Sequence, residues 1–271
     1  MAKARRELKD SLKLVDIVLE ILDARIPSSS RNPDINELTA AKPKLIILNK
    51  SDLADPQQTD QWLAWFKKAG VAATAVELLN GKGLRKVPTL VNQVVAPKMA
   101  ALVRSGRRTR AARCVIIGIP NVGKSSLINK LAERRVAKTG YQPGVTRGKQ
   151  WIRMVGGLEL LDTPGILWPK FDDPEAAFRL AVTGAIKEDV FNVFQATRQL
   201  VAWLAQNQPA ALKKRYRLAE LPADPDQLLG LIGASRGLIT AGGRADLEKA
   251  AQNVLKEFRE GHFGRITLDH L

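Results

Sequence analysis

Gly118-Ile119-Pro120-Asn121-Val122-Gly123-Lys124-Ser125-Ser126 follows the pattern G-x-x-x-x-G-K-[ST] without a mismatch. Its two glycines let the backbone fold tightly and turn N–H groups toward a phosphate. Lys124 adds positive charge for the terminal phosphates of a nucleotide, and the Ser125 hydroxyl suits Mg²⁺. We therefore predict a phosphate-binding loop, in which the nucleotide also contacts Asn121, Val122, Gly123 and Ser126.

The segments on either side of this loop support the prediction. Residues 114–117 form a short apolar run typical of a buried strand, and residues 125–132 are predicted to be a helix. The positive N-terminus of that helix would face the same anion. A glycine-rich turn that fits the pattern by chance is the alternative, and this order of strand, loop and helix disfavours it.

Composition limits the class of protein. A chain of 271 residues holds one large or two modest domains, and its 45% apolar content supports a core. Lys and Arg total 43 against 27 Asp and Glu, which gives a net charge of +16. Such an excess favours a polyanionic partner, namely RNA, DNA or an anionic membrane surface. A generally basic soluble protein remains the alternative.

Several other functions are disfavoured. The single cysteine, Cys114, excludes an internal disulfide and a cysteine-based zinc site, and its apolar strand suggests a core position. The two histidines lack metal-ligand spacing. No apolar run of 18 residues is present, and the charged first residues do not resemble a secretory signal. We expect a cytoplasmic protein without stable membrane association.

Strand and helix patterns alternate as far as about residue 170, and helices alone follow. Strands are predicted at 15–22, 44–48, 71–76 and 114–117, with a hairpin at 149–155 and 158–161. This pattern predicts an α/β domain with a mostly parallel sheet over residues 1–170, then a small all-α domain over 171–271. Residues 104–113 carry five arginines and no acid, and we expect an exposed linker that is either simply solvated or in contact with phosphates.

A tetrapeptide at the end of a predicted strand indicates the base. Asn49-Lys50-Ser51-Asp52 has the form N-K-x-D. The Asp52 carboxylate can accept hydrogen bonds from both N1–H and N2–H₂ of guanine, which adenine cannot offer. The Lys50 stem can lie flat on the purine. A surface turn is the alternative, but the phosphate loop in the same domain favours a guanine-binding motif, with Asn49, Lys50 and Asp52 at the nucleotide.

A second tetrapeptide, Asp162-Thr163-Pro164-Gly165, has the form D-x-x-G. A carboxylate there can hold Mg²⁺ through water, and a glycine N–H can approach the γ-phosphate. Thr146 lies between the two motifs, where a hydroxyl is placed to complete the Mg²⁺ shell. We predict Ser125, Thr146 and Asp162 as Mg²⁺ ligands. Lys124, Thr146 and Gly165 are predicted to act at the γ-phosphate.

The order of these motifs is unusual, because N-K-x-D precedes the phosphate loop and D-x-x-G comes last. The same sheet can form from a cut and rejoined chain, since the termini of a compact domain often lie close together. With residues 23–27, 29–33 and 183–186, these motifs resemble the YlqF/RbgA ribosome-biogenesis GTPases, which are circularly permuted, over nearly the whole chain. The resemblance implies a GTPase that assists assembly of the large ribosomal subunit and contacts its rRNA and ribosomal proteins.

The resemblance also implies details of catalysis. Ile166 stands after D-x-x-G in place of a glutamine that would position water, so slow intrinsic hydrolysis of GTP to GDP is expected until the subunit stimulates it. An asparagine at the position of Asn121 helps related GTPases to hold K⁺. Two roles are open for Asn121, that of a K⁺ ligand and that of a plain loop residue.

Two segments depart from the family pattern. Members usually begin with an extra segment that ends in a histidine before Met-Ala-Lys-Ala, whereas Met1 stands at that point, so an N-terminally incomplete form is expected. The loop that backs the base usually contains a small residue, whereas this chain has Glu77-Leu78-Leu79-Asn80-Gly81. We place the base contact around Asn80.

The permutation has a mechanical consequence, because D-x-x-G leads directly into the helical domain. That domain contains Lys213-Lys214-Arg215-Tyr216-Arg217, which we expect to contact rRNA phosphates, with Tyr216 stacking on a base or merely ending a solvated helix. Two rival functions stay open: an RNA-binding protein whose nucleotide site only stabilises the fold, and a GTPase that serves tRNA modification. A GTPase of membrane trafficking is disfavoured by the basic helical segment and by the lack of a predicted membrane anchor. An ATPase is disfavoured by Asp52.

Overall fold

The computed structural model describes residues 2–132, 151–161 and 173–271. Contacts divide the chain into two compact units. The first comprises residues 1–170 together with the last three residues, 269–271, and the second comprises residues 171–268. Within the part of the chain that the structure describes, no helix is both long and apolar enough to cross a membrane.

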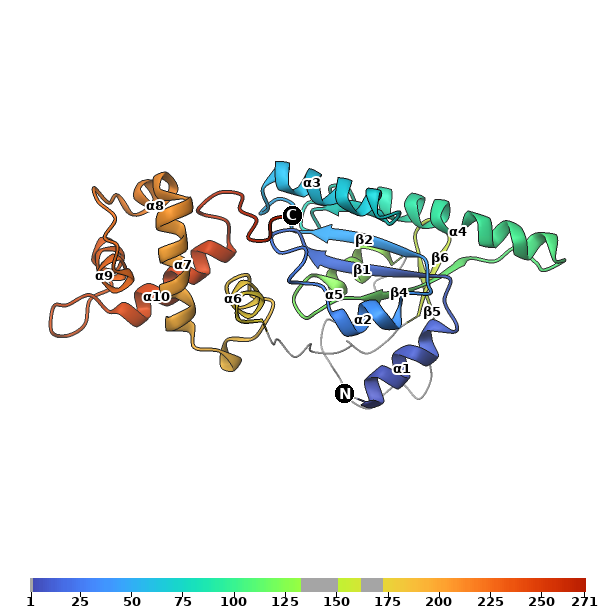
Figure 1. The fold of residues 1–271 in the computed structure, drawn as a ribbon, viewed down its shortest axis with the longest axis horizontal. Coiled ribbons are helices and arrows are strands. Elements are labelled where there is room, and N and C mark those ends of the chain that lie inside the picture. Colours follow the sequence, from blue (N-terminus) through green and yellow to red (C-terminus); the bar gives the residue numbers. More distant parts are fainter. Residues whose placement is uncertain (1, 133–150, 162–172) are drawn as a thin grey trace. The chain divides into compact units, whose positions relative to one another are not determined.

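The first unit is built on a six-stranded sheet (Figure 1). Its strands are β1 (Ile17–Asp23), β2 (Lys44–Asn49), β3 (Ala72–Val76), β4 (Ala112–Ile117), β5 (Trp151–Met154) and β6 (Leu158–Leu161). They lie in the order β3-β2-β1-β4-β6-β5, and every ladder is parallel except that between β5 and β6. The central strands are continuous apolar runs because helices cover both faces of a parallel sheet. The predicted mostly parallel sheet and the terminal hairpin are confirmed.

Three helices cover one face of this sheet: α1 (Ala2–Leu12), α2 (Pro33–Leu38) and α3 (Pro56–Lys68). Leu8 and Ile35 pack on Val18 in one core cluster. Trp62 and Phe66 of α3 pack on β1 and β2 in a second cluster. Both rings are buried, whereas the neighbouring Trp65 is 42% exposed because it lies off the buried stripe of the helix.

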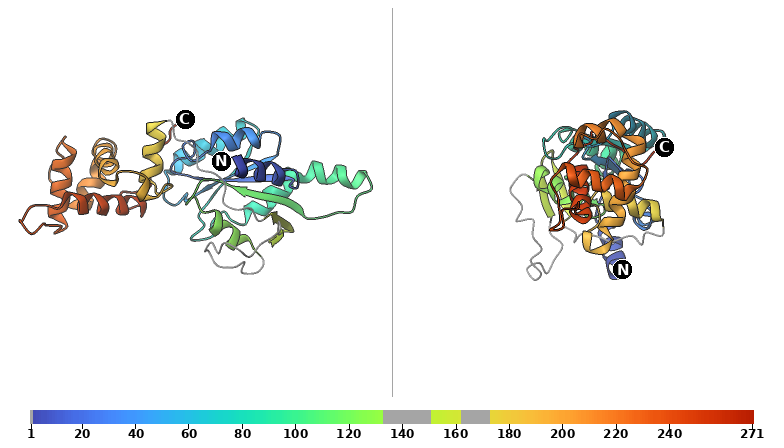
Figure 2. Two further views of the ribbon diagram at one scale, coloured as in Figure 1. Left: turned by 90° about the horizontal axis from the view of Figure 1, so that it is seen from below. Right: turned by 90° about the vertical axis from the view of Figure 1, so that its left-hand side faces the viewer.

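The long helix α4 (Lys86–Arg104) joins β3 to β4. This connection runs back across the sheet, so the right-handed crossover rule places α4 on the opposite face, where it contacts β1 to β4. Its buried residues include Val87, Val91 and Val95, one turn apart. Beyond Val95 the helix is no longer packed on the sheet, and its far end extends past the strands (Figures 1 and 2).

The basic segment 104–113 is less of a linker than expected. Ala112 already begins β4, and the Arg110 guanidinium bonds the buried Asp16 carboxylate at 2.6 and 2.9 Å. Arg113 pairs with Glu159 of the neighbouring strand at 3.2 Å and lies over the Trp151 ring. The prediction of a wholly exposed linker is therefore wrong at its C-terminal end, where the acids that neutralise the arginines come from distant strands.

The regular elements in the described residues of the second unit are helices, apart from an isolated antiparallel bridge between Ile239 and Ala245. The unit contains α6 (Pro174–Val182), a short 3₁₀ helix (Glu188–Val190), α7 (Val193–Asn207), α8 (Pro209–Tyr216), α9 (Pro225–Ser235) and α10 (Leu247–Arg259). Asp173 and Asp224 cap α6 and α9 immediately before a proline, which is the favoured way to begin a helix. Leu200 of α7, Ile232 of α9 and Val254 of α10 are fully buried, in agreement with the mutual contacts of these helices.

Candidate nucleotide-binding site

The phosphate-loop sequence connects the carboxyl end of β4 to α5 (Lys124–Leu131), the usual position of a ligand site in a parallel sheet. Gly118 and Gly123 have φ of 154° and 109°. A Cβ added at Gly118 would lie 2.5 Å from the Ile21 oxygen, and one at Gly123 would lie 2.4 Å from the Asn49 Nδ2. The close packing of the loop against β1 and β2 therefore requires glycine at both positions.

Lys124 lies folded back over this loop. Its Nζ donates hydrogen bonds to the carbonyl oxygens of Gly118 at 2.9 Å and Ile119 at 2.6 Å. Burial lowers the pKa of Lys124 to about 8. The side chains of Ser125 and Ser126 are exposed on the first turn of α5. The Ser125 hydroxyl is the kind of oxygen ligand that Mg²⁺ takes, so the described part of the loop fits the expected ion.

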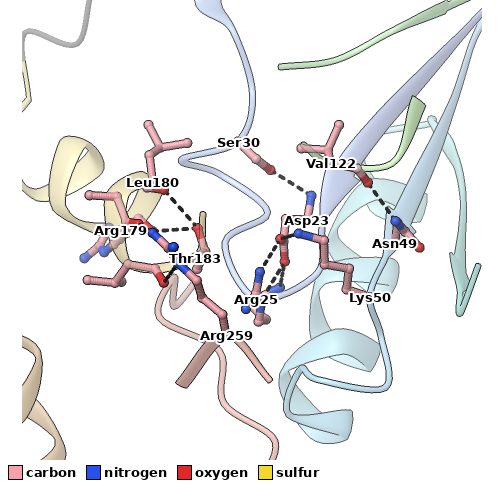
Figure 3. Close-up of polar contacts among 12 residues, drawn as sticks. Asp23, Arg25, Ser30, Asn49, Lys50, Val122, Arg179, Leu180, Thr183 and Arg259 are labelled. Atoms are coloured by element: carbon pink, nitrogen blue, oxygen red, sulfur yellow. Dashed lines mark hydrogen bonds and ion pairs between the residues drawn. The ribbon is translucent and has the colours of Figure 1, made fainter. Parts of the chain in front are cut away.

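Asn49 joins three segments that are far apart in the chain. Its Nδ2 donates to the Val122 carbonyl oxygen at 2.7 Å, and its Oδ1 accepts from the Leu78 N–H at 3.3 Å. The N-K-x-D segment, the phosphate loop and the loop after β3 therefore meet at one side chain. Figure 3 shows the first of these contacts, between Asn49 and Val122. Asn80 lies in the last of these loops and is exposed.

Lys50 is held by a carboxylate that our functional assignments did not include. Asp23, at the end of β1, is fully buried, and its Oδ2 lies 2.9 Å from the Lys50 Nζ and 2.7 Å from an Arg25 Nη (Figure 3). Burial raises the pKa of Asp23, but the charges of Arg25 and Lys50 outweigh that effect and hold it well below its usual range. Lys50 also adopts a left-handed φ of 61°, so both its backbone and its head group are constrained.

A signal for Asp23 was present in the sequence. It is an acid that ends an otherwise nearly apolar strand, and it is the register partner of Asn49 across the parallel ladder. The strand ends were predictable, but the pairing of β1 with β2 depends on the tertiary fold. The sequence alone therefore left Asp23 without a partner.

Asp52 presents its carboxylate on the surface of the turn that follows. The residue is partly exposed, and no other described residue is hydrogen-bonded or ion-paired to that carboxylate. Both of its oxygens are thus available as acceptors. Two donors on one edge of a guanine ring would match them.

Three predicted residues, Thr146, Asp162 and Gly165, lie outside the described residues. Their assignments to Mg²⁺ and to the γ-phosphate therefore stay predictions. Asn121 is described, and its backbone has a left-handed φ of 58°. Its assignment as a K⁺ ligand also stays a prediction.

The basic segment of the helical unit differs from expectation at its aromatic residue. Tyr216 is only 2% exposed, and its hydroxyl donates to Glu257 at 2.8 Å. Glu257 also accepts two bonds from Arg215 and one from Arg236. Both alternatives for Tyr216, stacking on a base and ending a solvated helix, are wrong, because a carboxylate on α10 fixes the ring inside the core. Lys213, Lys214 and Arg217 remain exposed.

Comparisons with known proteins give one consistent result. A family model described as "50S ribosome-binding GTPase" matches residues 113–221. Ribosome biogenesis GTPase A of Bacillus cereus is 46% identical over 99% of this chain and 91% of its own length. Mitochondrial ribosome-associated GTPase 1 of Xenopus tropicalis is 32% identical over 99% of this chain and 92% of its own length. The crystal structure of GNP-bound YlqF from T. maritima is similar with a TM-score of 0.67 and 27% identity, covering 99% and 98% of the two chains.

Proposed function

This chain belongs to the ribosome biogenesis GTPase A family and is a GTPase of ribosome biogenesis, and we propose that it acts on the large ribosomal subunit. The matching family model carries the description of a 50S ribosome-binding GTPase, which supports that choice of particle. The structural support for GTP binding is the contact of Asn49 with Val122, because it joins the proposed base-reading segment to the phosphate loop.

The fold is a circularly permuted GTPase domain, in which the N-K-x-D strand precedes the phosphate-loop strand. In the proposed mode of binding, the phosphate-loop N–H groups surround the phosphates and Lys124 neutralises their charge. Asp52 accepts the two guanine N–H groups, while the Asp23 carboxylate positions the Lys50 stem beneath the ring. Mg²⁺, when bound, supplies further charge neutralisation at the phosphates.

The residues that act at the γ-phosphate belong to the same proposal. Ser125, Thr146 and Asp162 would hold Mg²⁺, and Gly165 would approach the γ-phosphate through its N–H. Ile166 cannot orient a water molecule, so intrinsic hydrolysis is expected to be slow. A bound subunit, or a K⁺ held by Asn121, would then complete the site.

The helical unit is proposed to contact rRNA. Lys213, Lys214 and Arg217 are exposed cations near one end of α8. Lys214 and Arg217 line a groove whose lining also includes Arg215, Arg236 and His262. A surface of this kind suits RNA phosphates, and its affinity should fall steeply with salt. Two of the guanidiniums, those of Arg215 and Arg236, are partly neutralised by Glu257.

GTP turnover with and without purified ribosomal subunits tests the proposed particle. We expect large subunits to raise the turnover number at least about tenfold, because the particle completes a site that lacks a water-positioning side chain. Small subunits and tRNA serve as controls. An RNA-binding protein whose site only stabilises the fold predicts no stimulation, and a GTPase of tRNA modification predicts stimulation by tRNA instead. Either result would contradict the proposal.

A further inference from the structure

The free end of α4 is a projection with little packing beneath it. The buried stripe of the helix ends at Val95, whereas the helix continues to Arg104. From residue 100 to residue 110, every side chain is exposed except that of Leu102, which is half-buried. We call residues 99–109 the α4 tip. Figures 1 and 2 show this end of the helix standing clear of the strands of its own unit.

The charge around the tip is of one sign. Between Glu77 and Glu133 the sequence contains no acid, whereas it contains 11 lysines and arginines. Within the tip, Arg104, Arg107 and Arg108 make no ion pair with any described residue. Three exposed guanidiniums therefore lie within five residues of one another. Nearby charges of the same sign disfavour this arrangement unless an anion binds there.

A buried carboxylate anchors the base of the tip on both sides. Asp16, 1% exposed, accepts from the Lys98 Nζ at 2.6 Å on the outgoing helix. It also accepts from Arg110 at 2.6 and 2.9 Å, and from the Arg113 N–H at 2.9 Å, on the returning segment. The acid thus offsets part of the positive charge at the base and pairs with none of the arginines at the end. The base of the tip is thus held to the domain, while the charged end of the tip projects from it.

We propose that the α4 tip is an RNA-binding element of the GTPase domain, which contacts phosphates through Arg104, Arg107 and Arg108. Guanidiniums bind phosphate oxygens with two parallel hydrogen bonds, and Arg favours such sites over Lys. A helix that inserts into a membrane surface has a broad apolar face, whereas Val103 is the one large apolar side chain that the tip strongly exposes, at 52%. The choice of RNA rests on the proposed function in ribosome assembly.

A triple variant tests the tip directly. Arg104→Gln, Arg107→Gln and Arg108→Gln are combined in the full chain, with Lys9→Gln, Lys67→Gln and Lys68→Gln as a control of equal charge from exposed helix positions of the same unit. Binding of a fluorescent large-subunit rRNA transcript is measured against salt concentration. We expect the tip variant to lose about 10- to 100-fold in affinity at 0.1 M salt. Its log–log salt slope should become shallower by about two to three.

The control variant should bind the rRNA transcript as tightly as the wild type does. The wild type and both variants should bind a GTP analogue equally. Equal RNA affinity of the tip variant and the control would overturn the inference. So would tip-dependent binding to vesicles with anionic lipid but not to RNA. The wild-type protein could fail to bind large subunits while the tip variant still binds the rRNA transcript more weakly than the control. In that case the proposed particle is wrong, but the tip is still an RNA-binding element.

A cross-linking experiment tests the same contact without relying on a change in affinity. Cys114 is fully buried, so a thiol-directed photocrosslinker attached after Ser105→Cys labels the tip alone. With large subunits, cross-links to rRNA are expected from this position and not from Lys68→Cys on α3. The reverse pattern would contradict the tip as the contact.

Discussion

At the scale of single residues, the site depends on side chains that join segments rather than on isolated motifs. Asn49 contacts Val122 and Leu78, and Asp23 fixes Lys50 from the neighbouring strand. The motif residues are predictions that sequence alone allows, because phosphate and guanine chemistry demand particular groups at particular spacings. Asp23 could not be predicted, because its role depends on which strands pair. Tyr216 was mispredicted for the same reason, since Glu257 lies 41 residues away.

Asp52→Asn should change which base the protein accepts. The substitution replaces an acceptor oxygen with a donor, which opposes the guanine N2–H₂ and matches the 2-carbonyl of xanthine. We expect GTP affinity to fall at least about 100-fold and XTP affinity to rise. A site whose hydrogen-bonding groups do not match those of a base binds that base far more weakly. Titration with fluorescent nucleotides measures both. Exposed Asp60→Asn on α3 is the matched control, and retained GTP preference in Asp52→Asn would refute the assignment.

Asp23→Asn should weaken nucleotide binding through Lys50. Without the carboxylate the lysine stem loses its fixed position, so we expect about a tenfold loss of affinity for GTP and GDP alike. The same substitution made in a Lys50→Met background should have little further effect on nucleotide affinity, because the two act as one unit. Full additivity in that double-mutant cycle would indicate that Asp23 serves stability only.

At the scale of elements, the strands were predictable because buried parallel strands are continuous apolar runs, and their predicted bounds lie within two residues of those observed. Four helices begin with Asn-Pro or Asp-Pro, a signal that sequence reading finds readily. The projecting end of α4 was harder to predict, because the helix continues past the last of its residues that packs on the sheet. The ion pairs of Arg110 and Arg113 with distant strands were likewise outside the reach of a local pattern.

The anchor of α4 should make stability depend on pH. Burial raises the pKa of Asp16, but hydrogen bonds from Arg110 and Lys98 hold it well below its usual range. The folded state therefore resists protonation where the unfolded state accepts it. The stabilisation is present above the unfolded value, about pH 4, and is lost as pH falls toward the folded value.

Each such carboxylate contributes up to about 1.4 kcal/mol per pH unit to the slope below about pH 4. Asp16→Asn should therefore give a shallower dependence of the unfolding free energy on pH. Urea unfolding from about pH 5 to about pH 3 measures it, with Asp60→Asn as the exposed control. A slope in Asp16→Asn equal to that of the wild type would show that the anchor does not couple protonation to folding.

At the scale of the whole molecule, the chain leaves the GTPase unit and returns to it. Asp269 groups with the first unit, and it accepts two bonds at 2.7 Å from Ser29, from its N–H and its hydroxyl. Its carbonyl oxygen also accepts from the Trp62 indole N–H at 3.2 Å. Ser29 belongs to the loop that follows Asp23. The helical segment is thus an insertion in the chain of the first unit, whose last residues bind the loop after β1 and the indole of α3.

The strand order also has a consequence for the chain as it is being synthesised. Asp52 is synthesised roughly 70 residues before Lys124, so the segments of β1, β2 and β3 precede the phosphate loop along the growing chain. Until β4 arrives, the far side of β1 is an open edge able to pair with a wrong strand. The edge of β1 is thus open to mispairing while the chain is being made, and the arrival of β4 closes it.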